Sequence, residues 1–226
     1  AGGHGAFEPK KLPGFDTTPW EGKGVHYLVR SKDEFAGKNV LIVGGGDSAC
    51  DWTVNLLDTA ASVTLVHRRD GFRAHEATVQ EVNDAAEAGR VNLRTPFQIA
   101  EIYGNGQIER VEIFHSEIET EREHIDIDVV LLQLGFKTAL GPLKEWGFEI
   151  SKGALIVDDK MKTNLEGVWA CGDITTHDSK LKLIATGFAE AAVAVAQAVQ
   201  SFRPEMKLQP KYSTNTGVPG AVEGQA

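Results

Sequence analysis

Four strand-forming residues run directly into a glycine-rich turn in the segment Val40-Leu41-Ile42-Val43-Gly44-Gly45-Gly46-Asp47-Ser48-Ala49. A helical run follows from Cys50, and a second apolar run, Val63-Thr64-Leu65-Val66, comes after it. Short apolar runs separated by a glycine turn and a helix are typical of a β-α-β unit. The segment therefore predicts an α/β domain of the Rossmann-like kind.

The glycines follow the pattern G-x-G-x-x-A, which is a feature of dinucleotide-binding turns. Gly44 allows the tight turn, Gly46 lets the backbone approach a pyrophosphate, and Ala49 lets the helix pack closely on the strand. The helix N-terminus then directs free N–H groups at the phosphates. Ser48 is interpreted as a phosphate ligand and not as a nucleophile, because it lacks a G-x-S-x-G setting with a partner histidine. The predicted binding residues of this turn are Gly44, Gly45, Gly46, Asp47, Ser48 and Ala49.

The end of the second apolar run carries His67-Arg68-Arg69, and Arg73 follows one turn later. An NAD site needs an acidic residue at this point to bind the ribose 2′-hydroxyl. Guanidinium groups suit a 2′-phosphate instead, because their planar fork donates two parallel hydrogen bonds. The sequence therefore predicts a preference for NADP, bound by His67, Arg68, Arg69 and Arg73. The alternative is a solvated basic turn without a ligand.

The composition limits the classes of function. The 226 residues carry a formal net charge of −9, which argues against general nucleic-acid binding. No apolar run reaches the length of about 18 residues that a transmembrane helix needs, and the start of the chain has no signal-peptide pattern. Cys50 and Cys171 lie far apart, outside any C-x-x-C motif. We expect buried thiols in a cytoplasmic protein, no metal site, and no binding to nucleic acid or membrane.

The hydrophobic period changes to two in the middle of the chain, where Phe97 to Tyr103 and Ile108 to His115 flank the turn Gly104-Asn105-Gly106-Gln107. Ile125 to Leu134 continues this alternation into a buried run. The pattern predicts a three-stranded β-meander inserted before the last strand of the nucleotide-binding domain.

The later part of the chain predicts a second, smaller set of elements. Short strands are expected at Ala154 to Val157 and at Gly167 to Cys171, followed by a helix from about Thr186 to Ser201. Ala and Val occur on all sides of this helix, which predicts that it is well buried. The chain begins with a glycine-rich loop that has no strand before it, so we expect it to be the later part of a longer protein.

Three stretches stand out by their order and spacing. They are Gly44 to Ala49, His67 to Arg73, and Gly167-Val168-Trp169-Ala170-Cys171-Gly172-Asp173-Ile174 followed by Lys180-Leu181-Lys182-Leu183-Ile184. Together they resemble the thioredoxin-reductase-like flavoproteins, and the match looks closest to the ferredoxin (flavodoxin)–NADP reductases of this type. The resemblance runs from Ala1 to about Thr214 and corresponds to roughly the last two thirds of the family's length.

The resemblance implies a two-domain α/β flavoenzyme in which an NADP-binding domain is inserted into an FAD-binding domain. Residues 1–21 would end the first FAD-domain segment, and residues 22–137 would form the Rossmann-like NADP-binding domain with its inserted meander. Residues 138–202 would form the C-terminal part of a second Rossmann-like, FAD-binding domain, and residues 203–226 a C-terminal extension. Rotation of one domain on the other is expected at hinges near Thr18 to Gly24 and Gly135 to Gly141.

The resemblance also implies FAD-binding residues. Phe7 matches a position that borders the flavin, and Asp173 matches the carboxylate that hydrogen-bonds the ribityl chain. Tyr212 matches a residue that stacks on the flavin, typically of the partner subunit, with Ser213 and Thr214 near the polar edge of the flavin. For Tyr212, the alternative is a chance tyrosine in a disordered tail. The implied set is Phe7, Gly172, Asp173, Ile184, Tyr212, Ser213 and Thr214.

Two departures from the family pattern bear on function. Tyr27-Leu28-Val29-Arg30-Ser31 stands where thioredoxin reductases carry a C-x-x-C dithiol, so reduction of thioredoxin is not expected. The FAD glycine motif of the family would lie before Ala1, so we expect it either in a longer form of this chain or in a partner chain.

The resemblance implies hydride transfer from NADPH to FAD, then electron transfer to ferredoxin or flavodoxin, in a homodimer. No catalytic side chain is expected, because the cofactors carry the chemistry. Two alternatives stay open. One is another NADPH-dependent flavin reductase without a redox dithiol, and the other is a non-catalytic NADP-binding module.

Overall fold

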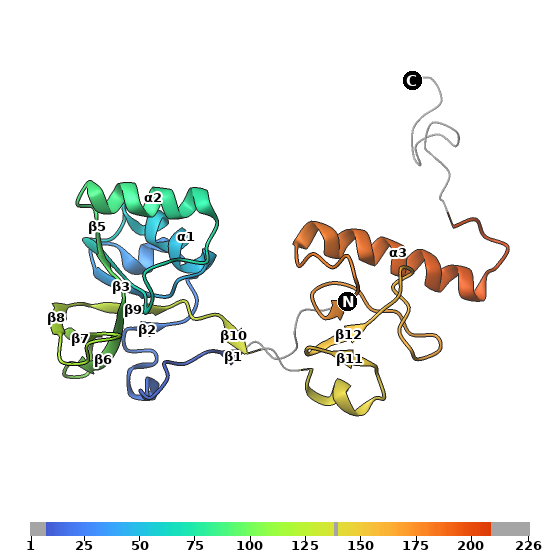
Figure 1. Cartoon of the computed structure of the whole chain (residues 1–226), viewed down its shortest axis with the longest axis horizontal. Helices are drawn as coiled ribbons and strands as arrows, with labels where there is room; N and C mark the ends of the chain where they lie inside the picture. Colours follow the sequence, from blue (N-terminus) through green and yellow to red (C-terminus); the bar gives the residue numbers. More distant parts are fainter. Residues whose placement is uncertain (1–7, 138–139, 209–226) are drawn as a thin grey trace, which may run out of the picture. The chain divides into compact units, whose positions relative to one another are not determined.

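The computed structural model describes residues 8–137 and 140–208, which fall into two compact units (Figure 1). One unit runs from Pro9 to Phe136, and the other contains Glu8 and the residues from Lys137 onwards. Each unit folds around hydrophobic clusters of its own.

The Pro9–Phe136 unit is built on a five-stranded parallel sheet with the strand order β2-β9-β3-β4-β5. The predicted β-α-β unit is confirmed, because β3 leads through α1 to β4 and the two strands pair in parallel. α2 then connects β4 to β5. The elements are β2 (Val25–His26), β3 (Asn39–Val43), α1 (Asp47–Leu56), β4 (Ser62–Val66), α2 (Glu76–Glu87), β5 (Val91–Arg94) and β9 (Val129–Leu132).

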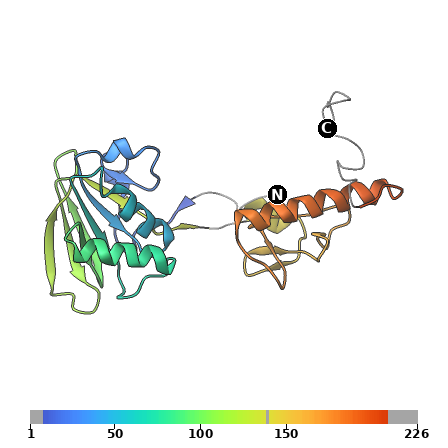
Figure 2. The same ribbon diagram turned by 90° about the horizontal axis from the view of Figure 1, so that it is seen from above.

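Both faces of this sheet are covered, which explains why its strands read as continuous apolar runs. Because side chains alternate along a strand, the residues of β3 are divided between two clusters. Val40 and Ile42 pack with α1, α2 and Phe35, the last residue of the 3-10 helix η2 (Lys32–Phe35). Leu41 and Val43 pack with the meander on the other face. Figure 2 shows the helices and the meander on opposite sides of the sheet.

The expected meander is present as three antiparallel strands in the order β6-β7-β8. They are β6 (Phe97–Tyr103), β7 (Arg110–His115) and β8 (Arg122–Asp126). The turn after β6 requires glycine at position 104, because a Cβ there would lie 1.8 Å from the Gln107 carbonyl oxygen. Ile99, Val111 and Ile113 are the buried side of the meander, and they face the five-stranded sheet.

The second unit contains a small sheet, β11-β12-β13, and one long helix. Its elements are the 3-10 helix η3 (Gly141–Glu145), β11 (Ile150–Ser151), β12 (Ala154–Ile156), β13 (Thr175–Thr176) and α3 (Ile184–Phe202). The strand predicted from Gly167 to Cys171 is wrong, since Trp169 forms only an isolated bridge with Lys162. Gly167 and Gly172 bracket this segment with φ angles of 74° and 85°, which interrupt an extended backbone.

α3 extends slightly beyond its predicted range at both ends, but the prediction that it is well buried is wrong. Among the described residues of this helix, only Glu190 and Ala194 are buried. Ile184 and Phe188 are 83% and 74% exposed. The helix packs on its unit along one face, while its apolar composition continues around the remaining surface.

The chain passes between the units at β1 (Glu8–Pro9) and β10 (Phe136–Lys137), and these two strands pair with each other. The segment Thr18 to Gly24, predicted as the first hinge, lies inside the Pro9–Phe136 unit. Thr18–Trp20 is a short 3-10 helix (η1) inside the Pro9–Phe136 unit. This segment belongs to the unit because three side chains that follow β1 pack against the hydrophobic cluster between the sheet and the meander. They are Leu12, Phe15 and Trp20.

Candidate functional site

A pocket of about 450 Å³ opens at the carboxyl ends of β3, β4 and β9, entirely within the Pro9–Phe136 unit. The chain leaves β3 toward β4 and β5 on one side, while β9 and β2 lie on the other, so the order of the strands reverses beside β3. Ligands of open α/β sheets bind in the crevice at such a switch point. The pocket is therefore in the position that this architecture provides for a nucleotide.

The space around the Cβ position differs among the three glycines of the turn. A Cβ on Gly44 would lie 2.5 Å from the Gln133 carbonyl oxygen and 2.8 Å from the Ala49 Cβ. A Cβ on Gly45 would lie 2.2–2.4 Å from three ring atoms of His67. A Cβ on Gly46 would meet no atom within 4 Å, so Gly46 alone faces open space.

The turn itself uses no left-handed backbone. None of the three glycines is among those with positive φ, and Gly46 is extended, with φ −108° and ψ −178°. Close packing, and not the turn conformation expected from the sequence, therefore explains Gly44. The open space at Gly46 is what the close approach of a ligand to the backbone requires.

The glycine turn and the basic segment are held together by hydrogen bonds. The Arg73 N–H donates to the Gly45 carbonyl oxygen at 2.7 Å, and the His75 N–H donates to the Asp47 carboxylate at 2.7 Å. Asp47 thus has a structural partner that the sequence did not reveal. Gly46 is the N-cap of α1, so the first N–H groups of this helix lie at the pocket beside Asp47 and Ser48.

His67 lies under the glycine turn with 7% of its surface exposed, and its ring stacks on Phe72 at a centroid distance of 5.3 Å. Its Nε2 is buried and has no hydrogen-bond partner among the described residues. Burial lowers the pKa of His67, and the nearby arginines lower it further, against an opposing hydrogen bond with the Gly71 backbone. His67 therefore contributes a neutral polar group to the pocket and not a cation.

Arg68 and Arg73 line the pocket, whereas Arg69 is exposed outside the lining. Within the described part of the chain, none of these three guanidiniums forms an ion pair. An unpaired guanidinium can bind an anion without first breaking another contact. The structure thus brings two of the three predicted arginines to one pocket.

The sequence reasoning missed the other walls of the pocket. They come from the segment after β1 (Lys10 to Pro13), from the meander (Phe97, Gln98, Ile99 and Phe114) and from the end of β9 (Gln133 to Gly135). Among these, the Lys11 ammonium pairs with the Glu21 carboxylate at 2.8 Å. No local pattern marks these residues, because they meet the glycine turn only through the folding of distant segments.

The residues assigned to FAD fall in the second unit or outside the described residues. Gly172 has φ 85°, and Asp173 follows it in a half-buried turn. Ile184 is the first residue of α3. Phe7, Tyr212, Ser213 and Thr214 lie outside the described residues.

Two kinds of feature are absent from the described residues. No helix among them is both long and apolar enough to cross a membrane. Likewise, no group of three or more His, Cys, Asp or Glu side chains in residues 8–137 and 140–208 could hold a metal ion.

Known proteins match this chain over most of its length. Residues 1–198 match the family described as pyridine nucleotide-disulphide oxidoreductase. The chain is 46% identical over 220 residues to a protein of Thermus thermophilus named Ferredoxin--NADP reductase, which covers 97% of this chain and 65% of that protein. It is 44% identical over 213 residues to a protein of the same name from Geobacillus thermodenitrificans, covering 94% of this chain and 63% of that protein.

Solved structures of thioredoxin reductases share the fold. The enzyme of Lactococcus lactis matches with a TM-score of 0.73 and 27% identity, covering 88% of this chain and 64% of that one. The enzyme of T. acidophilum matches with a TM-score of 0.73 and 24% identity, covering 89% of this chain and 64% of that one. The chain thus spans slightly less than two thirds of the length of the proteins that it matches.

Proposed function

Because the chain belongs to the pyridine nucleotide-disulphide oxidoreductase family, we propose that the full-length protein is a ferredoxin–NADP reductase. In this proposal it transfers a hydride from NADPH to FAD and then passes electrons to ferredoxin or flavodoxin. The names of relatives at 44–46% identity support this activity. Because the chain spans only 65% of such a relative, the activity is proposed for the full-length protein.

The pocket beside the glycine turn carries this proposal. We assign it to NADP, with the pyrophosphate at the open backbone of Gly46 and the N-terminus of α1. Arg68 and Arg73 would bind the 2′-phosphate, and Arg69 would add to the positive potential from outside the pocket. The free, buried Nε2 of His67 offers a hydrogen bond that the described protein groups do not satisfy. The pocket-lining residues at the end of β4 include no carboxylate that would repel the 2′-phosphate.

The second unit would provide part of the FAD site. Gly172 has no Cβ to obstruct a ligand, and the Asp173 carboxylate that follows could accept a hydrogen bond from a ribityl hydroxyl. Ile184, Phe7, Tyr212, Ser213 and Thr214 complete the proposed set. When bound, FAD supplies the hydride acceptor and the capacity to release electrons singly. We therefore assign Pro9–Phe136 to NADP and the other unit, which contains Glu8 and the residues from Lys137 onwards, to FAD.

Thioredoxin reduction is not part of the proposal, although the matched structures are thioredoxin reductases. That chemistry needs a reactive dithiol. Cys50 is fully buried in the hydrophobic cluster between the five-stranded sheet and the helices α1 and α2, and burial raises the pKa of its thiol to about 11. Cys171 is buried in the cluster of the other unit. A thiol with a pKa of about 11, as at Cys50, is not a nucleophile at neutral pH.

The proposed partner is a small electron carrier, ferredoxin or flavodoxin, and the proposed working form is a cytoplasmic homodimer. The homodimer follows from the resemblance of residues 209–214 to the segment that stacks on the partner's flavin. No nucleic-acid or membrane partner is proposed.

The absorption spectrum of the full-length natural protein tests the proposal. A flavin band that bleaches faster with NADPH than with NADH, and recovers on addition of ferredoxin, is the expected result. A colourless protein that binds NADPH would instead favour a non-catalytic nucleotide-binding module. A flavoprotein that reacts with NADPH but not with ferredoxin or flavodoxin would favour another flavin reductase.

A further inference from the structure

A buried ion pair between Glu190 of α3 and Lys180, which lies between β13 and α3, contacts the turn that follows the segment Gly167 to Cys171. Glu190 is 8% exposed, and the side chains of Lys180 and Glu190 are 6% and 9% exposed. The Lys180 Nζ lies 2.7 Å from each of the two Glu190 carboxylate oxygens. Few lysine and glutamate side chains are buried to this extent unless they are paired.

The pair holds both polar groups of one peptide residue, Gly172. The Gly172 N–H donates to the Glu190 Oε2 at 2.8 Å, and the Gly172 carbonyl oxygen accepts from the Lys180 Nζ at 2.8 Å. An ammonium group has three N–H donors, and all three of Lys180 are thereby used. The same carbonyl oxygen also accepts from the N–H and the hydroxyl of Thr175, at 3.0 and 2.8 Å.

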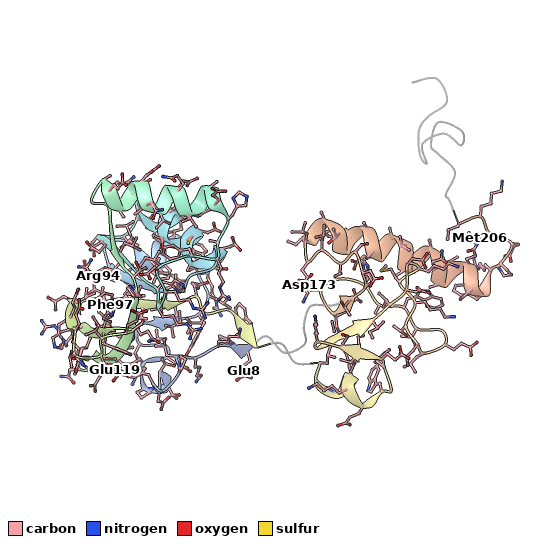
Figure 3. The ribbon with its side chains drawn as sticks, viewed as in Figure 1. Glu8, Arg94, Phe97, Glu119, Asp173 and Met206 are labelled. Atoms are coloured by element: carbon pink, nitrogen blue, oxygen red, sulfur yellow. The ribbon has the colours of Figure 1, made fainter. Side chains whose placement is uncertain are left out.

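Gly172 decides where the next side chain points. Its φ of 85° lies in the left-handed region, so the chain turns sharply between Cys171 and Asp173. Cys171 is anchored in the core of the unit, and Gly187 of α3 lies close enough that its Cβ would contact the Gly172 Cα at 3.5 Å. Figure 3 labels Asp173 beside the first turns of α3. The direction of Asp173 is therefore set by a backbone residue that the ion pair holds on both sides.

The charge state of the pair supports this geometry. Burial by itself raises the pKa of Glu190, but hydrogen bonds from Lys180, Gly172 and His177 outweigh burial and hold that pKa below its usual range. Glu190 is thus ionised at neutral pH. The His177 Nε2 lies 3.4 Å from the Glu190 Oε1, at the edge of the pair.

A buried ion pair is a poor source of net stability. The desolvation of two charges offsets most of their attraction, and apolar residues of similar volume are often as stable or more stable. A structural role could therefore be filled by an apolar contact between α3 and the turn. An apolar contact could not hydrogen-bond the N–H and carbonyl oxygen of Gly172, so the pair does what packing alone cannot.

We propose that Lys180 and Glu190 are positioning residues that hold the Gly172–Asp173 turn in the geometry needed to bind the ribityl chain of FAD. The inference rests on the proposed function, because it takes Asp173 as a flavin ligand. Neither Lys180 nor Glu190 is assigned a contact with the cofactor. Their effect on FAD passes through the backbone of Gly172.

The test uses three variants of the full-length natural protein: Glu190→Gln, Glu190→Ala and the double variant Lys180→Met/Glu190→Met. FAD affinity is measured by titrating flavin fluorescence, and the thermal midpoint of the apoprotein is measured separately. Glu190→Gln keeps a hydrogen-bond acceptor for the Gly172 N–H, so it should weaken FAD binding least among the three variants. Glu190→Ala should weaken FAD binding by about tenfold, the size of one charged hydrogen bond. Lys160→Met, which removes an exposed charge from the same unit, is the matched control and should leave FAD affinity unchanged.

The double variant separates positioning from stability. We expect its thermal midpoint to return toward the wild-type value while its FAD affinity stays about tenfold weaker, with a changed shape of the flavin absorption band. Recovery of FAD affinity together with the thermal midpoint would overturn the proposal, and so would wild-type FAD affinity in Glu190→Ala. NADPH affinity should be unchanged in every variant. A wild-type protein that binds no FAD would refute the proposed function itself, whereas normal FAD binding in all variants would refute only the positioning role.

Discussion

The backbone of Gly45 lies against the imidazole ring of His67, so closely that a Cβ at Gly45 would come within 2.2–2.4 Å of three ring atoms. The middle glycine of the turn is therefore required by a residue at the end of the next strand. His67 stacks in turn on Phe72, so one layer of contacts joins the glycine turn to the basic segment. The neighbouring Gly46 has no atom within 4 Å of its Cβ position, which makes the two glycines a matched pair for experiment.

Gly45→Ala should destabilise the fold, because the methyl group must displace the buried His67 ring. We expect a loss of about 1–3 kcal/mol of unfolding free energy, the usual cost of overpacking a core. Gly46→Ala is the control and should change stability by less than about 1 kcal/mol. The added methyl group would enter open space, and the φ angle of Gly46 is one that alanine adopts readily. Urea denaturation of both variants measures the difference. Equal losses in the two variants would contradict this account of Gly45.

Gly46→Ala should weaken NADPH although it leaves the fold intact. The added methyl group would occupy the space through which the pyrophosphate approaches the backbone. We expect a loss of about tenfold in affinity, equivalent to about 1.4 kcal/mol. NADH should lose a similar factor, because both cofactors carry the same pyrophosphate. Fluorescence titration of the two cofactors makes the measurement, and wild-type affinity for both would place the pyrophosphate elsewhere.

The arginines should distinguish the two cofactors from each other. Arg68→Ala and Arg73→Ala should each weaken NADPH by about 1.5–3 kcal/mol, as expected for a lost charged hydrogen bond. NADH lacks the 2′-phosphate, so its affinity should hardly change. Arg69→Ala is the internal control with a smaller effect, since Arg69 is not part of the pocket lining. Similar losses for NADPH and NADH in Arg68→Ala and Arg73→Ala would refute the assignment of the 2′-phosphate.

His67 should make the stability of the chain fall on acidification. Burial lowers its pKa from the ordinary value of 6.5, so below pH 6.5 the unfolded chain takes up a proton before the folded chain does. The stabilisation from neutral His67 is complete above pH 6.5 and is lost as the pH falls toward the lowered folded-state pKa. Burial also lowers the pKa of His26, which adds a second group with the same sign.

The measurement is the free energy of unfolding at a series of pH values on either side of 6.5. The slope below pH 6.5 should be reduced in His67→Gln and reduced further in His26→Gln/His67→Gln. A slope in His67→Gln identical to that of the wild type would show that His67 does not titrate differently in the folded and unfolded chains.

Local patterns were enough to predict the first β-α-β unit, the meander and the basic segment after β4. Strand and helix periods follow from backbone geometry, and a glycine turn interrupts them at a definite residue, so these features can be recognised in neighbouring residues. The burial of α3 could not be predicted in the same way. Ala and Val are distributed evenly around this helix, so the sequence does not identify which face is buried. Only the folded unit shows that Glu190 and Ala194 point inward.

Contacts between segments that are distant in the sequence could not be predicted from local sequence patterns. The sequence shows the three glycines of the turn, but it does not show that Gly45 packs against the His67 ring. That contact depends on the register of β3 beside β4. The sequence does not show that Leu12, Phe15 and Trp20 pack on the meander within the Pro9–Phe136 unit. It shows Lys180 and Glu190 as two ordinary charges. Only the folding of α3 against the turn makes them a buried pair around Gly172, since side-chain contacts across the chain arise from packing and not from local backbone preference.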